Sequence, residues 1–416
     1  MPAHADWVTR RPAVAPLLLA SGAILAMILL ALFPVAQRWA GDIRLFEHYA
    51  RMTFSGKLGE TPFLSWYPPL ALAPLGLPLL AGGGGAYAFA FGAEMAAVAS
   101  AGSVLLSQMT LAPDRLRRTL VYGFLVIAAT AFIAWRYDIV PAVFTLAALW
   151  ATSRRHWALA GAALGIATGL KLYAAILAPL LVLHAWRSGG RAAAVRVAVA
   201  GLLVGVASVA AYAFFPGASP MDLLAFTASR PLHLESVFGS VVAGLATIGM
   251  STAEVEFGFG SFNIIGAAAE SALLALRFVQ PLVLAASLAA GAYAIWRRRS
   301  GEADDVLALA WIAALLGILI SNRVLSPQYL VWILPLVPLV RGGLLPTVIG
   351  AFVVSIVVFP WLYTSLLALE PVPVTLILVR NTLLVVAWGV AMAGLVRSAS
   401  AASVSHNEGR IATGDA

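Results

Sequence analysis

Long apolar runs separated by short polar islands make up most of this chain. Many of the runs approach or exceed the roughly 20 residues that a helix needs to cross a bilayer. We expect crossings over 13–35, 86–107, 119–134, 139–153, 157–170, 171–186, 195–215, 272–296, 305–320, 328–340, 344–363 and 374–396. The pattern predicts an all-α polytopic membrane protein with about 12 transmembrane helices (about 10–13, because several runs are short) and both termini on one side.

The first long polar interruption is 41–70, which ends on Trp66, Tyr67 and two prolines. The segment that overlaps its end, 68–80, is apolar but short and contains four prolines. Counting it as a crossing would put the later arginine clusters on the wrong side of the membrane. We therefore expect a first outer loop over 36–85, in which 68–80 lies along or dips into the membrane, and a second long outer segment over 216–271.

Composition and charge support this topology. The chain is 62% hydrophobic and 11% charged, whereas soluble domains carry about 25% charged residues. Clusters such as Arg10-Arg11, Arg154-Arg155 and Arg297–Arg299 flank apolar runs, so the positive-inside rule places them, and both termini, in the cytoplasm. With this topology the net charge of +8 gives no reason to expect nucleic acid. We expect one membrane domain over 1–397 and a disordered cytoplasmic tail over 398–416.

The absence of cysteine excludes disulfides and Cys-ligated metal sites. The chain has no P-loop, GxGxxG, HExxH or GxSxG motif, and its histidines are scattered. We expect no cofactor, although a divalent ion held by Asp42 and Asp138 stays open and is not required.

Asp42 follows the first predicted crossing directly. A carboxylate at a membrane boundary is partly desolvated, which suits a general base. The alternatives are a solvated loop acid or an N-cap for a helix over 43–54, on which Glu47 and Arg51 are spaced to pair. Tyr67 lies in a rigid, proline-fixed piece that could line a sugar or lipid site, or simply sit at the interface.

Two later islands add charge between apolar runs. Arg136-Tyr137-Asp138 forms a short charged turn, which is either a plain salt bridge or the position of a second site carboxylate, Asp138. Lys171 is the only side chain that is charged at neutral pH between Trp157 and His184. An ionisable residue there is a functional hypothesis by default. Its ammonium could bind a phosphate or extend to the interface.

The remaining candidates lie in two outer islands. The first is Ser229–Ser236, with Arg230 and His233, which could equally be a solvated loop. The second is Ser321–Tyr329, where Arg323 offers a fork that matches phosphate oxygens. Gln328 and Tyr329 add neutral donors for sugar hydroxyls or phosphate.

Taken in order, the YPPL loop, the RYD turn, the GLKLY break, the RPLHLES segment and SNRVLSPQYLVW resemble the bacterial GT-C glycosyltransferases that use polyprenyl-phosphate sugars. The likeness extends over roughly 15–395 and is strongest to polyprenyl-phosphomannose-dependent α-mannosyltransferases. It implies a GT-C fold with a large first outer loop, and Asp42 matches the catalytic aspartate of that loop. The chain departs from the pattern at Ala174, where relatives often have proline, and at His233, where many have glutamine.

The resemblance implies an enzyme of the bacterial cytoplasmic membrane with its active site on the outer face. Asp42 would deprotonate an acceptor hydroxyl of a glycolipid, polysaccharide or protein, and the transfer would invert the anomeric centre. Lys171, Arg230 and Arg323 would stabilise the departing polyprenyl phosphate. Two alternatives stay open, namely a lipid or small-molecule transporter or flippase, and a glycan polymerase or ligase with a diphosphate-linked donor.

Overall fold

The computed structural model describes residues 41–109, 112–297, 304–340 and 342–413. Helices account for most of this part of the chain. The α-helices are α4 (Gly41–Phe54), α5 (Phe63–Trp66), α6 (Leu72–Gly76), α7 (Gly85–Met109), α8 (Ala112–Ala128), α9 (Thr130–Ile133), α10 (Ile139–Ser153), α11 (Trp157–Leu170), α12 (Ala178–Ala210), α13 (Pro220–Ser229), α14 (Val237–Thr247), α15 (Ala267–Arg297), α16 (Asp304–Ser321), α17 (Leu344–Ile356), α18 (Tyr363–Leu367) and α19 (Pro371–Thr413). Two strands, β1 (Glu254–Gly258) and β2 (Ser261–Ile265), complete the fold.

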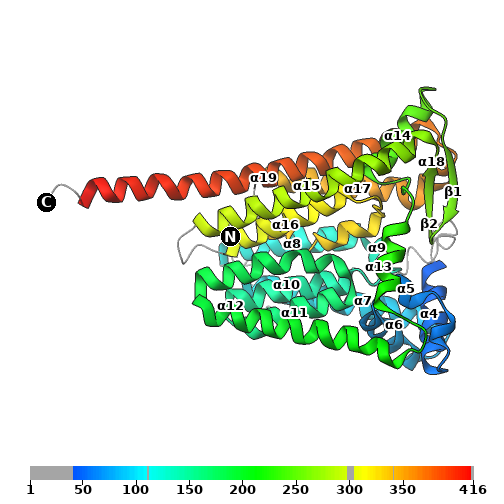
Figure 1. Ribbon diagram of the computed structural model, residues 1–416, viewed down its shortest axis with the longest axis horizontal. Coiled ribbons are helices and arrows are strands. Elements are labelled where there is room, and N and C mark those ends of the chain that lie inside the picture. Colours follow the sequence, from blue (N-terminus) through cyan, green and yellow to red (C-terminus); the bar gives the residue numbers. More distant parts are fainter. Residues whose placement is uncertain (1–40, 110–111, 298–303, 341, 414–416) are drawn as a thin grey trace, which may run out of the picture.

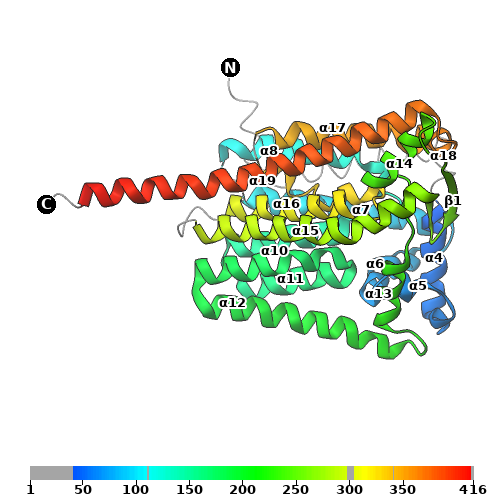
Figure 2. The ribbon, with the colours of Figure 1, turned by 45° about the horizontal axis from the view of Figure 1, so that its top comes forward.

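The long helices run side by side along one axis (Figure 1). The short helices α4–α6 and α13 gather at one end of this bundle together with the β1–β2 hairpin, and the second view agrees (Figure 2). We call this the hairpin end. Helix α19 extends beyond the opposite end (Figure 1).

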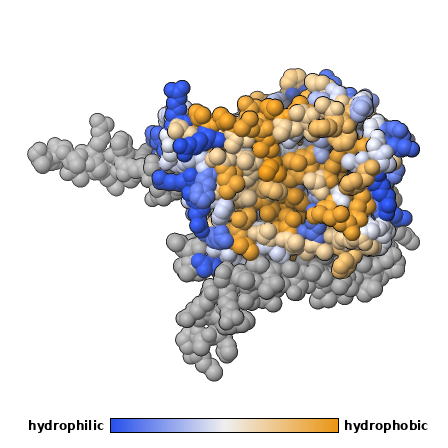
Figure 3. Space-filling view, turned by 90° about the horizontal axis from the view of Figure 1, so that it is seen from below, coloured by the Kyte–Doolittle hydropathy of each residue, from blue (hydrophilic) through white to orange (hydrophobic). Residues whose placement is uncertain are grey.

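On the face seen in Figure 3, an apolar belt lies between two hydrophilic ends of the bundle. On α12 and α15, large side chains point outward from the bundle; Leu202 is 67% and Leu282 is 69% exposed. Five helical stretches of the described chain are long and apolar enough to cross a membrane, namely 85–109, 172–214, 267–297, 344–367 and 371–400. The protein is thus a helical, multi-pass membrane protein.

Several predicted crossings coincide with helices. The runs 139–153 and 157–170 are α10 and α11 to the residue, and 86–107 and 305–320 lie within α7 and α16. The apolar stretch 171–215 is broken at Gly190, whose φ of 74° interrupts the helix, as two crossings require. The first predicted crossing, 13–35, lies outside the described residues, and the total of twelve stays a prediction.

One predicted crossing differs from a regular helix. The run 328–340 contains 3₁₀ helices over Pro327–Trp332 and Val337–Leu339, in place of one α-helix. Almost all of its side chains are buried among the surrounding helices, so packing and not helix propensity fixes its path. Helix α19 runs from the last predicted crossing to Thr413, and the assignment of 398–416 as a cytoplasmic tail stays a prediction.

The second outer segment adds a β-hairpin to the predicted helical fold, and the sequence analysis did not predict it. Strands β1 and β2 pair antiparallel from Glu254–Ile265 to Gly258–Ser261. Phe259 and Gly260 make the turn with φ values of 56° and 70°, the left-handed pair that a two-residue hairpin turn favours. Alternating Glu and apolar residues in β1 carried this signal in the sequence.

The segment 68–80 forms three short helices at the hairpin end, over Pro69–Ala71, Leu72–Gly76 and Leu77–Ala81. Its prolines prevent one continuous helix. Glu47 of α4 fixes this region. It pairs with Arg51 at 2.8 Å and accepts the backbone N–H of Gly84 at 3.0 Å, just before α7 begins. The expected Glu47–Arg51 pair is therefore confirmed.

Candidate active site

Asp42 lies in the first turn of α4 and faces the turn that precedes α10. Its Oδ2 is 2.6 Å from Nε of Arg136, which in turn donates from Nη1 to the carbonyl of Trp135 at 3.0 Å. Phe46, one turn along α4, is buried against Tyr137 with ring centroids 6.0 Å apart. The Asp42 side chain keeps 35% of its surface exposed, so the carboxylate is held in place and still open to a reactant.

Tyr67 stands beside this ion pair. Its backbone is extended (φ −137°, ψ 144°), as the following proline requires. Its ring packs edge-on to Tyr137 at 5.8 Å and against Phe63 at 5.3 Å. Burial raises the pKa of Tyr67, and the charge of Asp42 raises it further. The phenol therefore stays protonated and can donate a hydrogen bond to a sugar or phosphate oxygen.

Asp138 and Lys171 form a second ion pair. Lys171 follows the last residue of α11 in an extended conformation, so its side chain leaves the helix and reaches Asp138 Oδ1 at 2.5 Å. The same oxygen accepts the indole N–H of Trp332 at 2.7 Å. The Asp138 side chain is only 2% exposed and that of Lys171 17%, so each charge is compensated where it is buried.

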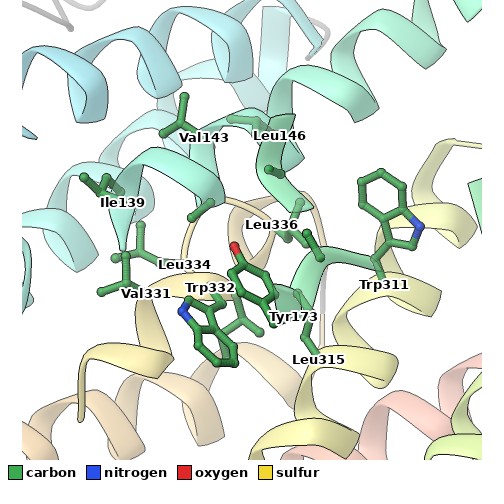
Figure 4. Packing of buried hydrophobic residues seen from close by; sticks show 14 of the residues in the cluster. Ile139, Val143, Leu146, Tyr173, Trp311, Leu315, Val331, Trp332, Leu334 and Leu336 are labelled. Carbon is green, nitrogen blue, oxygen red and sulfur yellow. The ribbon is translucent and has the colours of Figure 1, made fainter. Parts of the chain in front are cut away.

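Aromatic rings enclose the Lys171 ammonium. Its Nζ lies 5.4 Å from the ring of Tyr137, 5.2 Å from Tyr329 and 5.6 Å from Trp332, within cation–π range. Trp332 stacks between Tyr329 at 4.2 Å and Tyr173 at 4.1 Å; Figure 4 shows the Tyr173 and Trp332 rings side by side in the core. Gln328, half-buried, precedes Tyr329 on the same 3₁₀ helix.

Arg323 and Arg230 form a separate group at the hairpin end. Arg323 Nη1 donates to the carbonyls of Ala228 at 2.7 Å and Arg230 at 2.9 Å, at the C-terminal end of α13. The Arg230 side chain donates to Ser261 Oγ at 2.8 Å, and its buried Nε has no acceptor among the described residues. Within the described part of the chain, neither guanidinium pairs with a carboxylate.

His233 belongs to the framework of this group. Its side chain is buried, and its Nδ1 accepts the backbone N–H of Glu235 at 3.2 Å. Burial and the nearby charges of Arg230 and Arg380 lower the pKa of His233 to about 3. The ring is neutral at physiological pH, and its expected role in phosphate binding stays untested.

The structure thus brings the sequence candidates into two groups. Asp42, Tyr67, Asp138, Lys171 and Tyr329 are linked through the Arg136–Asp138 turn, with Gln328 adjacent. Arg230, His233 and Arg323 form the second group. Between the two groups, Trp66 of α5 packs against Phe226 of α13, with ring centroids 5.7 Å apart. Asp42 and Asp138, considered for a divalent ion, each face a cationic side chain, and no three metal-ligating side chains gather in the described residues.

Sequence reasoning missed two residues of this region. Arg136 was seen only as part of a charged turn, yet it holds Asp42. Arg380 was overlooked although it interrupts an apolar run of α19, which is itself a signal. It pairs with Glu235 Oε2 at 2.8 Å, both side chains being 1% exposed, and Asn381 donates to Ser240 Oγ at 2.8 Å. Both contacts fasten α19 to the second outer segment.

Comparison with known families gives one match. The sequence model of Glycosyltransferase family 87 matches residues 63–322, which is more than half of the chain. The matched span contains Tyr67, Asp138, Lys171, Arg230 and His233; it begins after Asp42 and ends just before Arg323. No curated protein and no solved structure matches the chain.

Proposed function

Because the chain belongs to glycosyltransferase family 87, we propose that this membrane glycosyltransferase moves a sugar, mannose in the first instance, from a polyprenyl phosphate to an acceptor hydroxyl. The observation that carries the proposal is the oriented, half-exposed Asp42 carboxylate beside Tyr67. A general base must hold its carboxylate within reach of the acceptor proton, and Arg136 fixes that position.

The reaction needs one base and one anion-binding group. Asp42 takes the proton of the acceptor hydroxyl while its oxygen attacks the anomeric carbon. The bond from that carbon to the phosphate oxygen breaks, and the electron pair leaves with polyprenyl phosphate. Attack opposite the leaving group inverts the anomeric centre, and the proton on Asp42 later passes to solvent. Tyr67, Gln328 and Tyr329 are the neutral groups that would contact the sugar.

The charge balance supports a proposed position for the leaving phosphate. Lys171 is compensated by Asp138, whereas Arg230 and Arg323 contact only neutral acceptors. These two arginines therefore supply the net positive charge that stabilises the phosphate as it departs. The Lys171 ammonium keeps further N–H donors beside its bond to Asp138, and these would contact the phosphate from the other side of the site.

The proposed orientation places the hairpin end on the outer face of the bacterial cytoplasmic membrane. Arg154-Arg155 follows α10, Arg187 and Arg191 flank the kink of α12 at Gly190, and Arg297 is the last residue of α15, all at the opposite end of the bundle. The positive-inside rule makes that end cytoplasmic. Asp42, Glu235 and the hairpin carboxylates then lie outside, where a glycolipid, polysaccharide or protein acceptor is reached.

The experiment that tests this function uses the purified protein and a labelled polyprenyl-phosphomannose donor with membrane lipid as acceptor source. The expected result is release of polyprenyl phosphate together with a mannosylated product. Donors that carry glucose, arabinose or galactosamine identify the sugar. Movement of intact donor without release would indicate a flippase, and activity only with a diphosphate-linked donor would indicate a polymerase or ligase; either result contradicts the proposal.

A further inference from the structure

Arg277 is an arginine on the outward surface of a membrane-spanning helix. It lies within α15, in the stretch 267–297 that is long and apolar enough to cross a membrane, and its side chain is exposed. Leu274 and Phe278 beside it are 56% and 67% exposed, as expected of lipid-facing positions. Placing a charged arginine against the lipid costs free energy, so its presence calls for a functional explanation.

The packing of α15 on α16 places Arg277 next to the second group of the active site. The two helices are antiparallel, and Gly317 of α16 packs against Val283 of α15. Arg277 precedes Val283 by six residues and Arg323 follows Gly317 by six, so both lie at the same level toward the hairpin end. Burial lowers the pKa of Arg323, and the positive charge of Arg277 lowers it further, which agrees with this placement.

Positive charge accumulates here without a carboxylate to balance it. The other buried cations of this end have acidic partners: Arg136 pairs with Asp42, Lys171 with Asp138 and Arg380 with Glu235. Among the described residues, Arg277, Arg323 and Arg230 have none. Two neighbouring guanidinium groups repel each other in a low-dielectric setting, and an anion that contacts both converts this repulsion into attraction.

The surroundings of Arg277 fit an anion that carries a hydrocarbon chain. A guanidinium binds phosphate oxygens through two parallel N–H groups, and its stem can lie along apolar surface while the head reaches a head group. Leu274 and Phe278 offer apolar surface on either side. Pro281, one turn further along α15, lacks the N–H that would bond the carbonyl of Arg277, which loosens the helix at this level.

We propose that Arg277 is a lipid-facing phosphate ligand that captures the phosphate of the polyprenyl-phosphate donor from the bilayer and passes it to Arg323 and Arg230. This inference rests on the proposed function, because it assigns the route by which the proposed donor enters. It adds a residue outside the catalytic group: Arg277 sets the affinity for the lipid phosphate, and Asp42 sets the rate of the chemical step.

The test compares Arg277→Gln and Arg277→Lys with Arg196→Gln, a matched change of an exposed arginine on α12. Two quantities are measured on the full chain in detergent micelles: the dependence of transfer rate on donor concentration, and direct binding of labelled polyprenyl phosphate. Loss of a charge-assisted phosphate contact raises the donor KM and the Kd of polyprenyl phosphate about 10- to 100-fold. We expect kcat to stay close to that of the wild type, Arg277→Lys to recover part of the affinity, and Arg196→Gln to change neither quantity.

Two results would overturn this assignment while leaving the proposed function intact. One is an Arg277→Gln protein that transfers sugar with the wild-type donor KM and binds polyprenyl phosphate as tightly. The other is an effect on binding of phosphatidylglycerol vesicles alone, which would make Arg277 a contact for bulk lipid. A wild-type protein that neither transfers from nor binds the polyprenyl-phosphate donor would refute the proposed function itself.

Discussion

Arg136 and Asp42 form an ion pair that would orient the proposed catalytic carboxylate. The guanidinium reaches across from the turn before α10 and fixes one carboxylate oxygen at 2.6 Å, leaving the other oxygen for an acceptor hydroxyl. A base whose direction is set in advance avoids the entropic cost of ordering it during the reaction. We therefore infer that Arg136 acts through Asp42 and not on the sugar.

Replacing Arg136 by glutamine should lower kcat about 10- to 100-fold, the range expected when a reacting group is misplaced by about 1 Å, while donor KM changes little. Arg136→Lys keeps the charge but loses the fork and should recover only part of the rate. Steady-state kinetics of the purified variants measure this. Arg51→Gln is the control, because Arg51 pairs with Glu47 on the far side of α4. Wild-type kcat in Arg136→Gln would show that Asp42 needs no such support.

The buried, neutral His233 makes a pH-dependent contribution to stability. Its folded pKa is about 3, whereas an unfolded histidine titrates near 6.5. Between these values the unfolded chain binds a proton that the folded chain does not, so the free energy of unfolding falls as pH falls. The loss approaches about 1.4 kcal/mol per pH unit and amounts to roughly 2–3 kcal/mol between pH 6.5 and 4.5.

His233→Gln removes this titration. We expect the unfolding free energy of the wild type to drop more steeply on acidification than that of His233→Gln, with the difference confined to pH below about 6.5. Denaturant unfolding in detergent across this pH range gives both slopes. Parallel curves for the two proteins would mean that the pKa of His233 is the same in the folded and unfolded states.

For individual residues, the sequence predicted which side chains belong to the site more reliably than it predicted which side chains they contact. The order of the polar islands pointed to Asp42, Lys171 and Arg323, and the structure places all three at one end of the bundle. Arg136 was missed because its role depends on α4 packing over the turn before α10, through Phe46 and Tyr137. The phosphate-binding role of Lys171 stays a prediction; its pairing with Asp138 was not foreseen, because it depends on contacts between distant segments.

Among the elements, the second outer segment carries the most unexpected structure. Residues 230–236 run alongside β2, with Leu234 N–H donating to Phe262 O at 3.1 Å and Ile264 N–H to Leu232 O at 2.9 Å. On the other side, His233 N–H donates to Arg323 O at 2.9 Å. The Arg380–Glu235 pair then joins this layer to α19. Arg230 and Arg323 are therefore presented by a rigid framework and not by a solvated loop.

Breaking the Arg380–Glu235 pair should destabilise this framework. Arg380→Met leaves Glu235 buried and unpaired, and losses of about 3–5 kcal/mol are typical of such changes. Adding Glu235→Leu removes the stranded charge and should recover much of the loss. Denaturant unfolding measures both variants beside Glu270→Gln, an exposed change on α15 that should stay within about 0.5 kcal/mol. Equal stability of Arg380→Met and wild type would show that the pair contributes nothing.

The apolar and polar pattern predicted those helices whose ends are set by nearby residues in the sequence. The helices α10 and α11 were predicted to the residue because turns with Arg154-Arg155 and Lys171 bound their apolar runs. The irregular path of 327–340 was not, since its 3₁₀ helices depend on burial against neighbouring helices. The hairpin had a visible alternation in β1, but the strength of the helical signal on both sides of it favoured an all-α reading.

Over the whole molecule, the two ends differ in chemistry. The hairpin end carries the paired carboxylates and the three unbalanced arginines. The opposite end carries the arginines that follow α10, flank the kink of α12 and end α15. An apolar belt lies between them (Figure 3). This separation was predictable from sequence, because charge distribution around apolar runs follows topology, whereas the convergence of polar islands into one site required the tertiary fold.

The proposed orientation can be tested directly because the chain contains no cysteine. Single cysteines introduced at Glu254 on β1 and at Arg191 near the kink of α12 are both at exposed positions. In intact cells, a membrane-impermeant maleimide should label Glu254→Cys, and it should label Arg191→Cys only after the membrane is permeabilised. The reverse pattern would place the hairpin end in the cytoplasm.

The most direct test of the central claim is the Asp42→Asn protein in a single-turnover assay with labelled polyprenyl-phosphate sugar. The account predicts that release of polyprenyl phosphate slows about 10²- to 10⁴-fold, the usual contribution of a general base, while donor binding stays near that of the wild type. Glu254→Gln, an exposed change at the same end, should react normally. Turnover by Asp42→Asn at the wild-type rate, with donor bound equally well, would contradict the assignment of Asp42 as the base.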